Sequence, residues 1–389
     1  MNTGKTIFAQ VMDYVPVRRF GTCVRRYDGD KHIRTLSCLD QFCCMAFAQL
    51  TYRESLRDTV TCLRAVEPLL YHMGIRGKIA RSTLADANRK RDWRIYADFS
   101  KILIDRAKRL YANTALPVNL DATVYALDST VIDLCMSLFP WASYKSTKSA
   151  VKLHTMLDIR GNIPEFIHIS DGKLADMEAL DYFPIKPGTF TVMDRGYVDF
   201  ARLNRFERAK AFFIVRAKKN LKYSRRYSRQ VDKSTGVQCD QTIVLTGYYS
   251  SQTYPQHLRR IRFFDRGQER RFYFLTNNFD LPPLTICELY RSRWRVELFF
   301  RWIKQHLRIK SFFGYEENAV KTQIWVAVSA YLLVAIMRKE LALEQNMYEI
   351  LQILSITALS KAPVIQVFND FRETQTEIGS CKQLSFMDF

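Results

Sequence analysis

Acidic residues are scarce in this 389-residue sequence: 39 Asp and Glu stand against 59 Lys and Arg, which leaves a formal net charge of +20 at pH 7. Such an excess favours a polyanionic partner, most often nucleic acid. A basic protein on a membrane surface would share the charge, but no amphipathic Lys/Arg segment stands out. The longest apolar run, Ile324 to Met337, is interrupted by Ser329 and is too short to span a bilayer, so we predict a buried helix and no membrane partner.

Paired cysteine spacings are also missing. The sequence has nine cysteines, an odd number, and no two of them are separated by two residues. Several lie in apolar stretches, where a free thiol behaves as a small hydrophobic group. We therefore expect reduced cysteines in a cytoplasmic protein, and the lack of an apolar signal core at the N-terminus favours the same compartment. His154 and His168 lie in predicted strands without a zinc-binding pattern, so we expect ordinary core or surface histidines.

Proline and glycine are absent from Tyr290–Lys304, which is therefore predicted to be one helix. At about 100° per residue, the spacing returns four polar residues to one helical face: Tyr290, Arg293, Glu297 and Lys304. A carboxylate flanked by cations and a phenol suits a site that holds a metal and a nucleic-acid strand. From the spacing alone, a core helix with a solvated basic stripe is an equally good interpretation.

Two upstream aspartates lie in apolar surroundings. Asp128 is inside the strand-like run Val124 to Leu134, and Asp194 follows the apolar strand Phe190 to Met193. An ionised carboxylate at such a place is costly unless it is paired or bound to a metal. With Glu297 they would make three carboxylates able to hold two divalent cations, and oxygen ligands favour Mg²⁺. Taken singly, either aspartate could instead cap a turn or end a strand.

The order of predicted elements divides the chain into five parts. Residues 1–120 are predicted to be helical, either as a DNA-binding bundle or as a plain scaffold. Residues 121–216 predict three strands, helix, strand, helix and strand, which is a mixed α/β sheet covered by helices. Residues 217–283 predict a β-rich insertion. The Glu297 helix lies in 284–340, and 341–389 are predicted to be helical, as a packing cap or a dimer contact.

Together these residues resemble the signature of DDE transposases of the insertion-sequence-four family. Asp128-Ser-Thr resembles the first motif of that family and Asp194-Arg-Gly-Tyr the second. The third motif matches Tyr290, Arg293, Glu297 and Lys304, and the similarity covers roughly residues 120–320. It implies a ribonuclease-H-like core split by the insertion. It also implies that Asp128, Asp194 and Glu297 are catalytic and hold Mg²⁺, with Mn²⁺ as a substitute.

The resemblance implies cleavage at transposon ends and transfer of the 3′-hydroxyl into target DNA, by a homodimer in the bacterial cytoplasm. Tyr290, Arg293 and Lys304 would hold phosphates, and Trp294 would stack near a displaced base. Lys218 and Lys219 are predicted to contact the DNA backbone, or else belong to a solvated basic face.

The insertion lacks the tryptophan with which some relatives hold a displaced base, since the five tryptophans of this chain all lie outside residues 217–283. A tyrosine or phenylalanine replaces it, or the protein works without that wedge. Two alternative functions stay open at this stage. One is a ribonuclease-H-like nuclease without strand transfer, and the other is a DNA-binding protein derived from a transposase.

Overall fold

The computed structural model describes residues 4–145, 148–306 and 312–371. The chain divides into two compact units. A helical unit contains the residues up to Leu110 and those from Trp302 onward, and a sheet unit spans Tyr111–Arg301. The five-part division predicted from the sequence is finer than these two units and stays a prediction.

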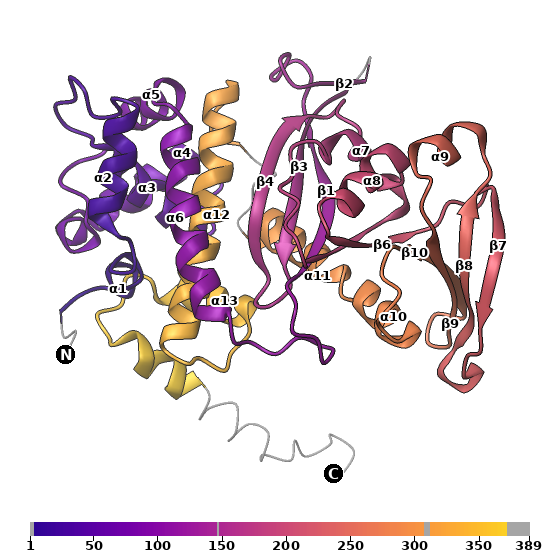
Figure 1. Cartoon of the computed structure of the whole chain (residues 1–389). Helices are drawn as coiled ribbons and strands as arrows, with labels where there is room; N and C mark the ends of the chain where they lie inside the picture. The colour runs from indigo at the N-terminus through magenta and orange to yellow at the C-terminus, as the bar shows by residue number, and fades with distance from the viewer. Residues whose placement is uncertain (1–3, 146–147, 307–311, 372–389) are drawn as a thin grey trace, which may run out of the picture. The chain divides into compact units, whose positions relative to one another are not determined.

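The helical unit joins the two ends of the chain around one long apolar helix. Its elements are α1 (Ile7–Met12), α2 (Val17–Arg26), α3 (Cys38–Leu50), α4 (Leu56–Ala65), η1 (Glu67–Leu69), η2 (Tyr71–Met73), α5 (Arg81–Lys90), α6 (Arg94–Tyr111), η5 (Trp302–His306, a π-helix), α12 (Glu317–Glu340) and α13 (Met347–Thr357). Helix α12 packs against α3, α5 and α13, and Figure 1 shows it in orange among the N-terminal helices. The Ser100 and Ser329 hydroxyl oxygens, 2.8 Å apart, join α6 to α12.

Helix α12 contains the run Ile324 to Met337 and is buried within the protein. By length and composition it is the one helix among the described residues that could cross a bilayer, yet 94% of its most apolar window is buried inside the structure. Burial of this kind is expected of a core helix, which agrees with the predicted buried helix. Eight cysteines lie in the described residues and all are free thiols, whereas Cys381 lies outside them.

The sheet unit holds ten strands in one sheet. The strands are β1 (Val124–Leu134), β2 (Ser143–Lys145), β3 (Lys148–Asp158), β4 (Ile163–Asp171), β5 (Phe190–Met193), β6 (Phe212–Arg216), β7 (Tyr223–Arg229), β8 (Val237–Leu245), β9 (Leu258–Asp265) and β10 (Arg270–Thr276). The helical elements are α7 (Asp176–Ala179), η3 (Arg195–Tyr197), α8 (Phe200–Arg208), η4 (Lys233–Thr235), α9 (Tyr248–Thr253), α10 (Pro283–Arg291) and α11 (Trp294–Arg301).

The strand order places the ends of three parallel strands at one edge of the sheet. Strands β4, β3 and β1 form an antiparallel meander, and β5 and then β6 follow parallel to β1. This order is the one expected of the predicted ribonuclease-H-like core, and the mixed α/β fold is confirmed. Parallel strands have their C-terminal ends at the same edge of the sheet. The segments that follow β5 and β6 therefore leave the sheet beside the C-terminal half of β1, which begins at Asp128.

The insertion extends the core sheet and is not a separate one. Strand β10 pairs antiparallel with β6, and β9, β8 and β7 continue outward from it (Figure 1). One hydrophobic cluster runs through both parts and includes Val215 of the core with Ile243, Leu258 and Leu275 of the insertion. Strand β7 escaped the sequence interpretation because its basic composition hides its alternation.

The predicted single helix Tyr290–Lys304 is interrupted. Helix α10 ends at Arg291 and α11 begins at Trp294, with a tight turn between them. The Ser292 hydroxyl donates to the carbonyl of Leu289 at 2.6 Å, and the Arg293 N–H bonds to Tyr290 three residues back at 3.1 Å. A serine that bonds to the backbone of the preceding turn bends helices, which explains the break.

Candidate active site

Two of the predicted catalytic carboxylates lie next to each other on neighbouring parallel strands, Asp128 within β1 and Asp194 directly after β5. Leu127 of β1 pairs with Met193 of β5, so the next residues, Asp128 and Asp194, start side by side. Glu297 lies on α11, which packs against β1. The electrostatic effect of both Asp194 and Glu297 on the pKa of Asp128 places all three acids in one local field. The sequence-predicted triad is therefore brought together within the sheet unit.

Arg293 bridges the first and third carboxylates. Its guanidinium forms ion pairs with Asp128 and with Glu297, the second at 2.6 Å. The side chains of Arg293 and Asp128 are 17% and 19% exposed, whereas that of Glu297 is 54% exposed and faces solvent. Burial by itself lowers the pKa of Arg293, but Asp128, Tyr290 and Glu297 raise it above the ordinary value, so this cation stays charged. Its buried Nε has no hydrogen-bond partner among the described residues.

Asp128 remains short of positive charge despite this arginine. The pKa of Asp128 is raised to about 6, and burial of the carboxylate is the largest cause. Arg293 and the N–H of Ser129, which donates to Asp128 at 2.9 Å, lower the pKa, and Glu297 and Asp194 raise it again. A carboxylate with a raised pKa among other carboxylates gains from an added cation.

Tyr290 lines a cavity of about 460 Å³ next to Asp194. Its hydroxyl donates to Asp194 at 3.3 Å, and its ring lies 4.5 Å from that of Phe274. Burial, followed by the charge of Asp194, raises the pKa of Tyr290 to about 12, which keeps the phenol protonated as a donor. Trp294, 55% exposed, and Phe272 of the insertion line the same cavity. Phe272 and Phe274 of the insertion therefore line the cavity that contains Asp194 and Tyr290.

The remaining predicted residues lie at different places. Lys218 and Lys219 are exposed and follow β6 at the edge that carries Asp194. The Lys218 ammonium donates to the carbonyl of Val198 at 3.0 Å. Lys304 lies in the π-helical segment Trp302–His306 of the helical unit, so its part in the site stays a prediction.

The chemistry of the donor set fits a hard divalent cation. All three predicted ligands are carboxylates, which Mg²⁺ and Mn²⁺ prefer. The pKa of Asp128 is raised first by burial and then by the charges of Glu297 and Asp194. In the described residues no three His, Cys, Asp or Glu side chains are already gathered in ligating positions. Instead, the guanidinium of Arg293 forms ion pairs with both Asp128 and Glu297, and its single positive charge offsets one of these two negative charges.

A second polar group behind the triad was missed from the sequence. Asp176 accepts from Ser129 at 2.6 Å and pairs with Lys152 at 2.7 Å. Burial alone raises the pKa of Asp176, but these two hydrogen bonds lower it below the ordinary value. This network fixes the residue that follows Asp128. Ser129, Lys152 and Asp176 come from three separate segments, so no local pattern predicts their contact. The only signal in the sequence was Lys152, a lysine inside the apolar run of β3.

Comparisons with known proteins bear on the same residues. A family described as the transposase DDE domain matches residues 119–333, which contain Asp128, Asp194 and Glu297. A second family, described as a domain of unknown function (DUF4372), matches residues 3–76. The first match covers more than half of the chain.

Similar proteins carry related names. A Sinorhizobium fredii protein named as transposase y4zB is 34% identical over 65% of this chain and 70% of its own length. The transposase of insertion sequence element IS5377 from Geobacillus stearothermophilus is 32% identical over 53% of this chain and 54% of its own length. The transposase of insertion sequence element IS4SA from Synechocystis is 23% identical over 82% of this chain and 89% of its own length. A solved piggyBac transposase synaptic complex with hairpin DNA aligns at a TM-score of 0.45 and 10% identity, over 89% of this chain and 77% of that one, and carries no argument.

Proposed function

This chain belongs to the DDE transposases of the insertion-sequence-four family, and we propose that it cuts DNA at transposon ends and joins the freed 3′-hydroxyls to target DNA. The family is one of DNA-cutting and DNA-joining enzymes, so DNA is the partner, and its DDE domain implies dependence on a divalent metal. The finer statements below about metal, residues and assembly are part of the proposal.

The observation that carries the proposal is that Asp128 and Asp194 follow paired residues of two parallel strands, while Arg293 joins Asp128 to Glu297 on α11. We assign these three carboxylates as the ligands of Mg²⁺, with Mn²⁺ as a substitute. The bound metal would lower the pKa of an attacking water or 3′-hydroxyl and stabilise the leaving oxygen. Every other contribution comes from side chains that bind and orient the DNA strand.

In this proposal, Arg293 and Tyr290 hold the phosphate next to the cut. The Nε donor of Arg293 is buried without a partner in the described part of the chain, and a guanidinium matches the geometry of phosphate oxygens. Tyr290 stays protonated and already donates to Asp194, so it can fix that carboxylate or a phosphate oxygen. Trp294 offers an exposed ring for a base displaced from the helix. Lys218, Lys219 and Lys304 would bind the backbone.

The test is cleavage of a labelled duplex that carries the inverted repeat flanking the gene, in Mg²⁺. We expect wild type to cut at the repeat end, and Glu297→Gln to lose cutting by about a hundredfold or more while it still binds the end. Glu269→Gln is the matched control, since Glu269 is an exposed acid in the turn between β9 and β10 and should cut like wild type.

Equal cleavage by wild type and Glu297→Gln would overturn the assignment of Glu297. Cleavage without transfer of a pre-cut 3′-hydroxyl end would favour a nuclease, and end binding without any cleavage a DNA-binding protein. We also propose that two copies act together, because two ends must be paired. Sedimentation of the protein with end DNA should then show two chains per pair of ends.

A further inference from the structure

Three cavities of the sheet unit adjoin along the segment that follows β6. The cavity beside Asp194 and Tyr290 shares Arg216 with a second cavity of about 440 Å³. This second cavity shares Lys218 with a third, of about 530 Å³. Because β5 and β6 are parallel, the segment begins at the edge where Asp194 lies. We call the second and third cavities together the exit groove.

The second cavity is lined by cations that have no counter-charge among the described residues. No carboxylate is found among its described lining residues, and none of its cations has an ion pair there. Arg260 is held in place between the rings of Tyr223 and Tyr273, 4.9 and 4.8 Å from their centroids. Gathered like charges repel one another, so such a cavity is stabilised by an anion. Its six cations are Arg195, Arg216, Lys218, Lys219, Arg260 and Arg271.

The third cavity carries two exposed aromatic rings. Tyr248 and Tyr249 begin α9, and their residues are 72% and 78% exposed. Their ring centroids lie 5.1 Å apart at an angle of 84°, so each ring leaves a face open to solvent. Exposed tyrosines gain little by contact with water, and nucleobases stack on such faces.

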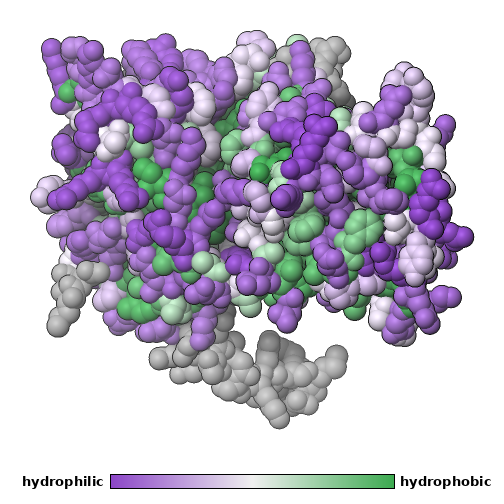
Figure 2. All heavy atoms as spheres, in the orientation of Figure 1, coloured by the Kyte–Doolittle hydropathy of each residue, from purple (hydrophilic) through white to green (hydrophobic). Residues whose placement is uncertain are grey.

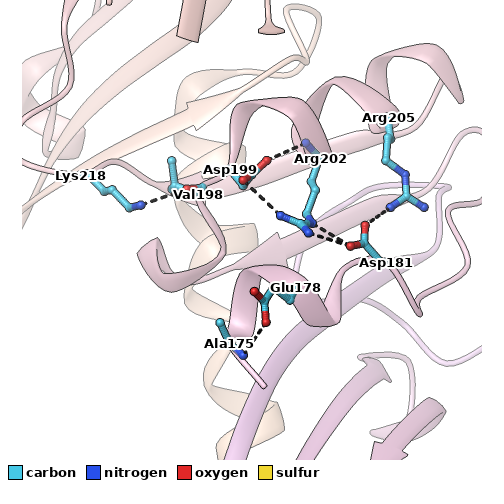
Figure 3. A network of polar contacts seen from close by, with 8 residues as sticks. All are labelled: Ala175, Glu178, Asp181, Val198, Asp199, Arg202, Arg205 and Lys218. Carbon is cyan, nitrogen blue, oxygen red and sulfur yellow. Dashed lines mark hydrogen bonds and ion pairs between the residues drawn. The ribbon is translucent and has the colours of Figure 1, made fainter. Parts of the chain in front are cut away.

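Asp199, which lines the third cavity, belongs to the polar network in Figure 3. Asp199 accepts from the Arg202 N–H at 2.9 Å and pairs with its guanidinium at 3.2 Å. Asp181 binds both Arg202 and Arg205 at 2.7 Å, which ties the segment after α7 to α8. Asp199, the acid that lines this cavity, is thereby neutralised. The groove keeps a positive field next to its tyrosines.

We propose that the exit groove binds an unpaired DNA strand that leaves the catalytic centre. Its phosphates lie in the basic cavity, and its bases stack on Tyr248 and Tyr249. The inference rests on the proposed function, since the strand is the one handled at Asp194. Cationic grooves with aromatic rings bind single strands, whereas a duplex hides its base faces. A second copy of this basic chain would be repelled from the same cations.

The experiment is fluorescence anisotropy in EDTA, so that no cleavage is needed. A blunt duplex end is compared with the same end carrying a short single-stranded poly(dT) extension. We expect the extension to tighten binding by wild type, and the double variant Tyr248→Ala/Tyr249→Ala to lose about tenfold or more of that gain. Binding of the blunt duplex should not change. Tyr248→Phe/Tyr249→Phe should keep the gain, because phenyl rings still stack.

The basic cavity is tested by Lys219→Gln/Arg271→Gln, which should weaken binding of the extension and flatten its salt dependence. Tyr71→Ala is the matched control for the tyrosine variant Tyr248→Ala/Tyr249→Ala, since Tyr71 is 83% exposed but lies in the helical unit. It should keep the gain in affinity from the extension. The proposal is overturned if the extension adds no affinity, if Tyr248→Ala/Tyr249→Ala keeps the gain, or if that variant changes only the oligomeric state. These results are independent of cleavage, so a failure of the proposed function is seen separately in the Glu297→Gln assay.

Discussion

At the scale of single residues, the candidate centre depends on how one arginine is shared. Arg293 forms ion pairs with both Asp128 and Glu297, although these acids come from a strand and a helix far apart in the sequence. The pKa of Asp128 is nevertheless raised, to about 6, because burial and two further acids outweigh the arginine. A site with this balance accepts a divalent cation at lower cost than one already neutral.

A second residue-scale consequence concerns His154, which is fully buried on β3 with Ser170 3.2 Å from its Nε2. Burial, with help from Lys152, lowers its pKa from 6.5 to about 4. Between about pH 6.5 and 4, His154 is protonated in the unfolded chain but neutral in the folded protein. The free energy of unfolding therefore falls as the pH drops through this window. His154 alone should account for a loss of about 3 kcal/mol across this window.

Urea denaturation at pH 7 and pH 4.5 measures this effect. His154→Gln keeps a neutral hydrogen-bonding side chain and should flatten the pH dependence of the free energy of unfolding. His257→Gln, which removes an exposed histidine, should leave the wild-type dependence intact. An unchanged pH dependence in His154→Gln would contradict the assignment.

At the scale of elements, local patterns were predicted well and pairings between distant segments were not. The strands around Asp128 and Asp194 follow from their apolar runs, and the buried helix α12 from its composition. The pairing of β10 with β6 has no local signal, so the insertion could not be placed in the core sheet. The turn at Ser292 was missed because it depends on one side chain that bonds to its own backbone.

For the candidate site too, the residues were predicted from local patterns and the contacts between distant segments were not. Asp128, Asp194 and Glu297 were found from their residue types and order, but the contacts that hold them were not. Nothing in the sequence connects Asp176 with Ser129. The donation of Tyr290 to Asp194 likewise depends on where two strands and a helix end.

One buried ion pair links the insertion to the start of α10. Arg259 and Asp240, both 2% exposed, form two hydrogen bonds of 2.9 and 2.7 Å. Arg259 also donates to the carbonyl of Leu281 at 2.6 Å, just before the helix that carries Tyr290. Arg259→Met should lower the free energy of unfolding by about 3–5 kcal/mol, because Asp240 loses its buried partner and keeps only the longer ion pair with Arg229, at 3.6 Å.

Chemical denaturation of three variants tests this link. The double variant Arg259→Met/Asp240→Leu should recover much of the loss, since no charge is then left buried without its pair. Arg266→Met removes an exposed arginine of the neighbouring turn and should change stability by less than about 0.5 kcal/mol. A single variant as stable as wild type would show that the pair does not hold the insertion.

At the scale of the whole molecule, the net charge of +20 predicts strong electrostatic attraction to the phosphates of DNA. Hydrophilic residues cover most of the face seen in Figure 2. DNA binding by such a protein releases counterions, so the affinity for a random duplex should fall about a thousandfold or more between about 50 and 200 mM salt. Anisotropy titrations over this range measure the slope, and an affinity that hardly changes would contradict a broad phosphate interface.

The most direct test of the account is strand transfer by the whole protein, with a pre-cut 3′-hydroxyl end, plasmid target and Mg²⁺. We predict that Asp128→Asn, Asp194→Asn and Glu297→Gln each reduce joined product to background, and that the triple variant is no worse than any single one, because the three carboxylates act as a unit. All four variants should still bind the end. Wild-type levels of joining in any single variant would contradict a shared catalytic centre.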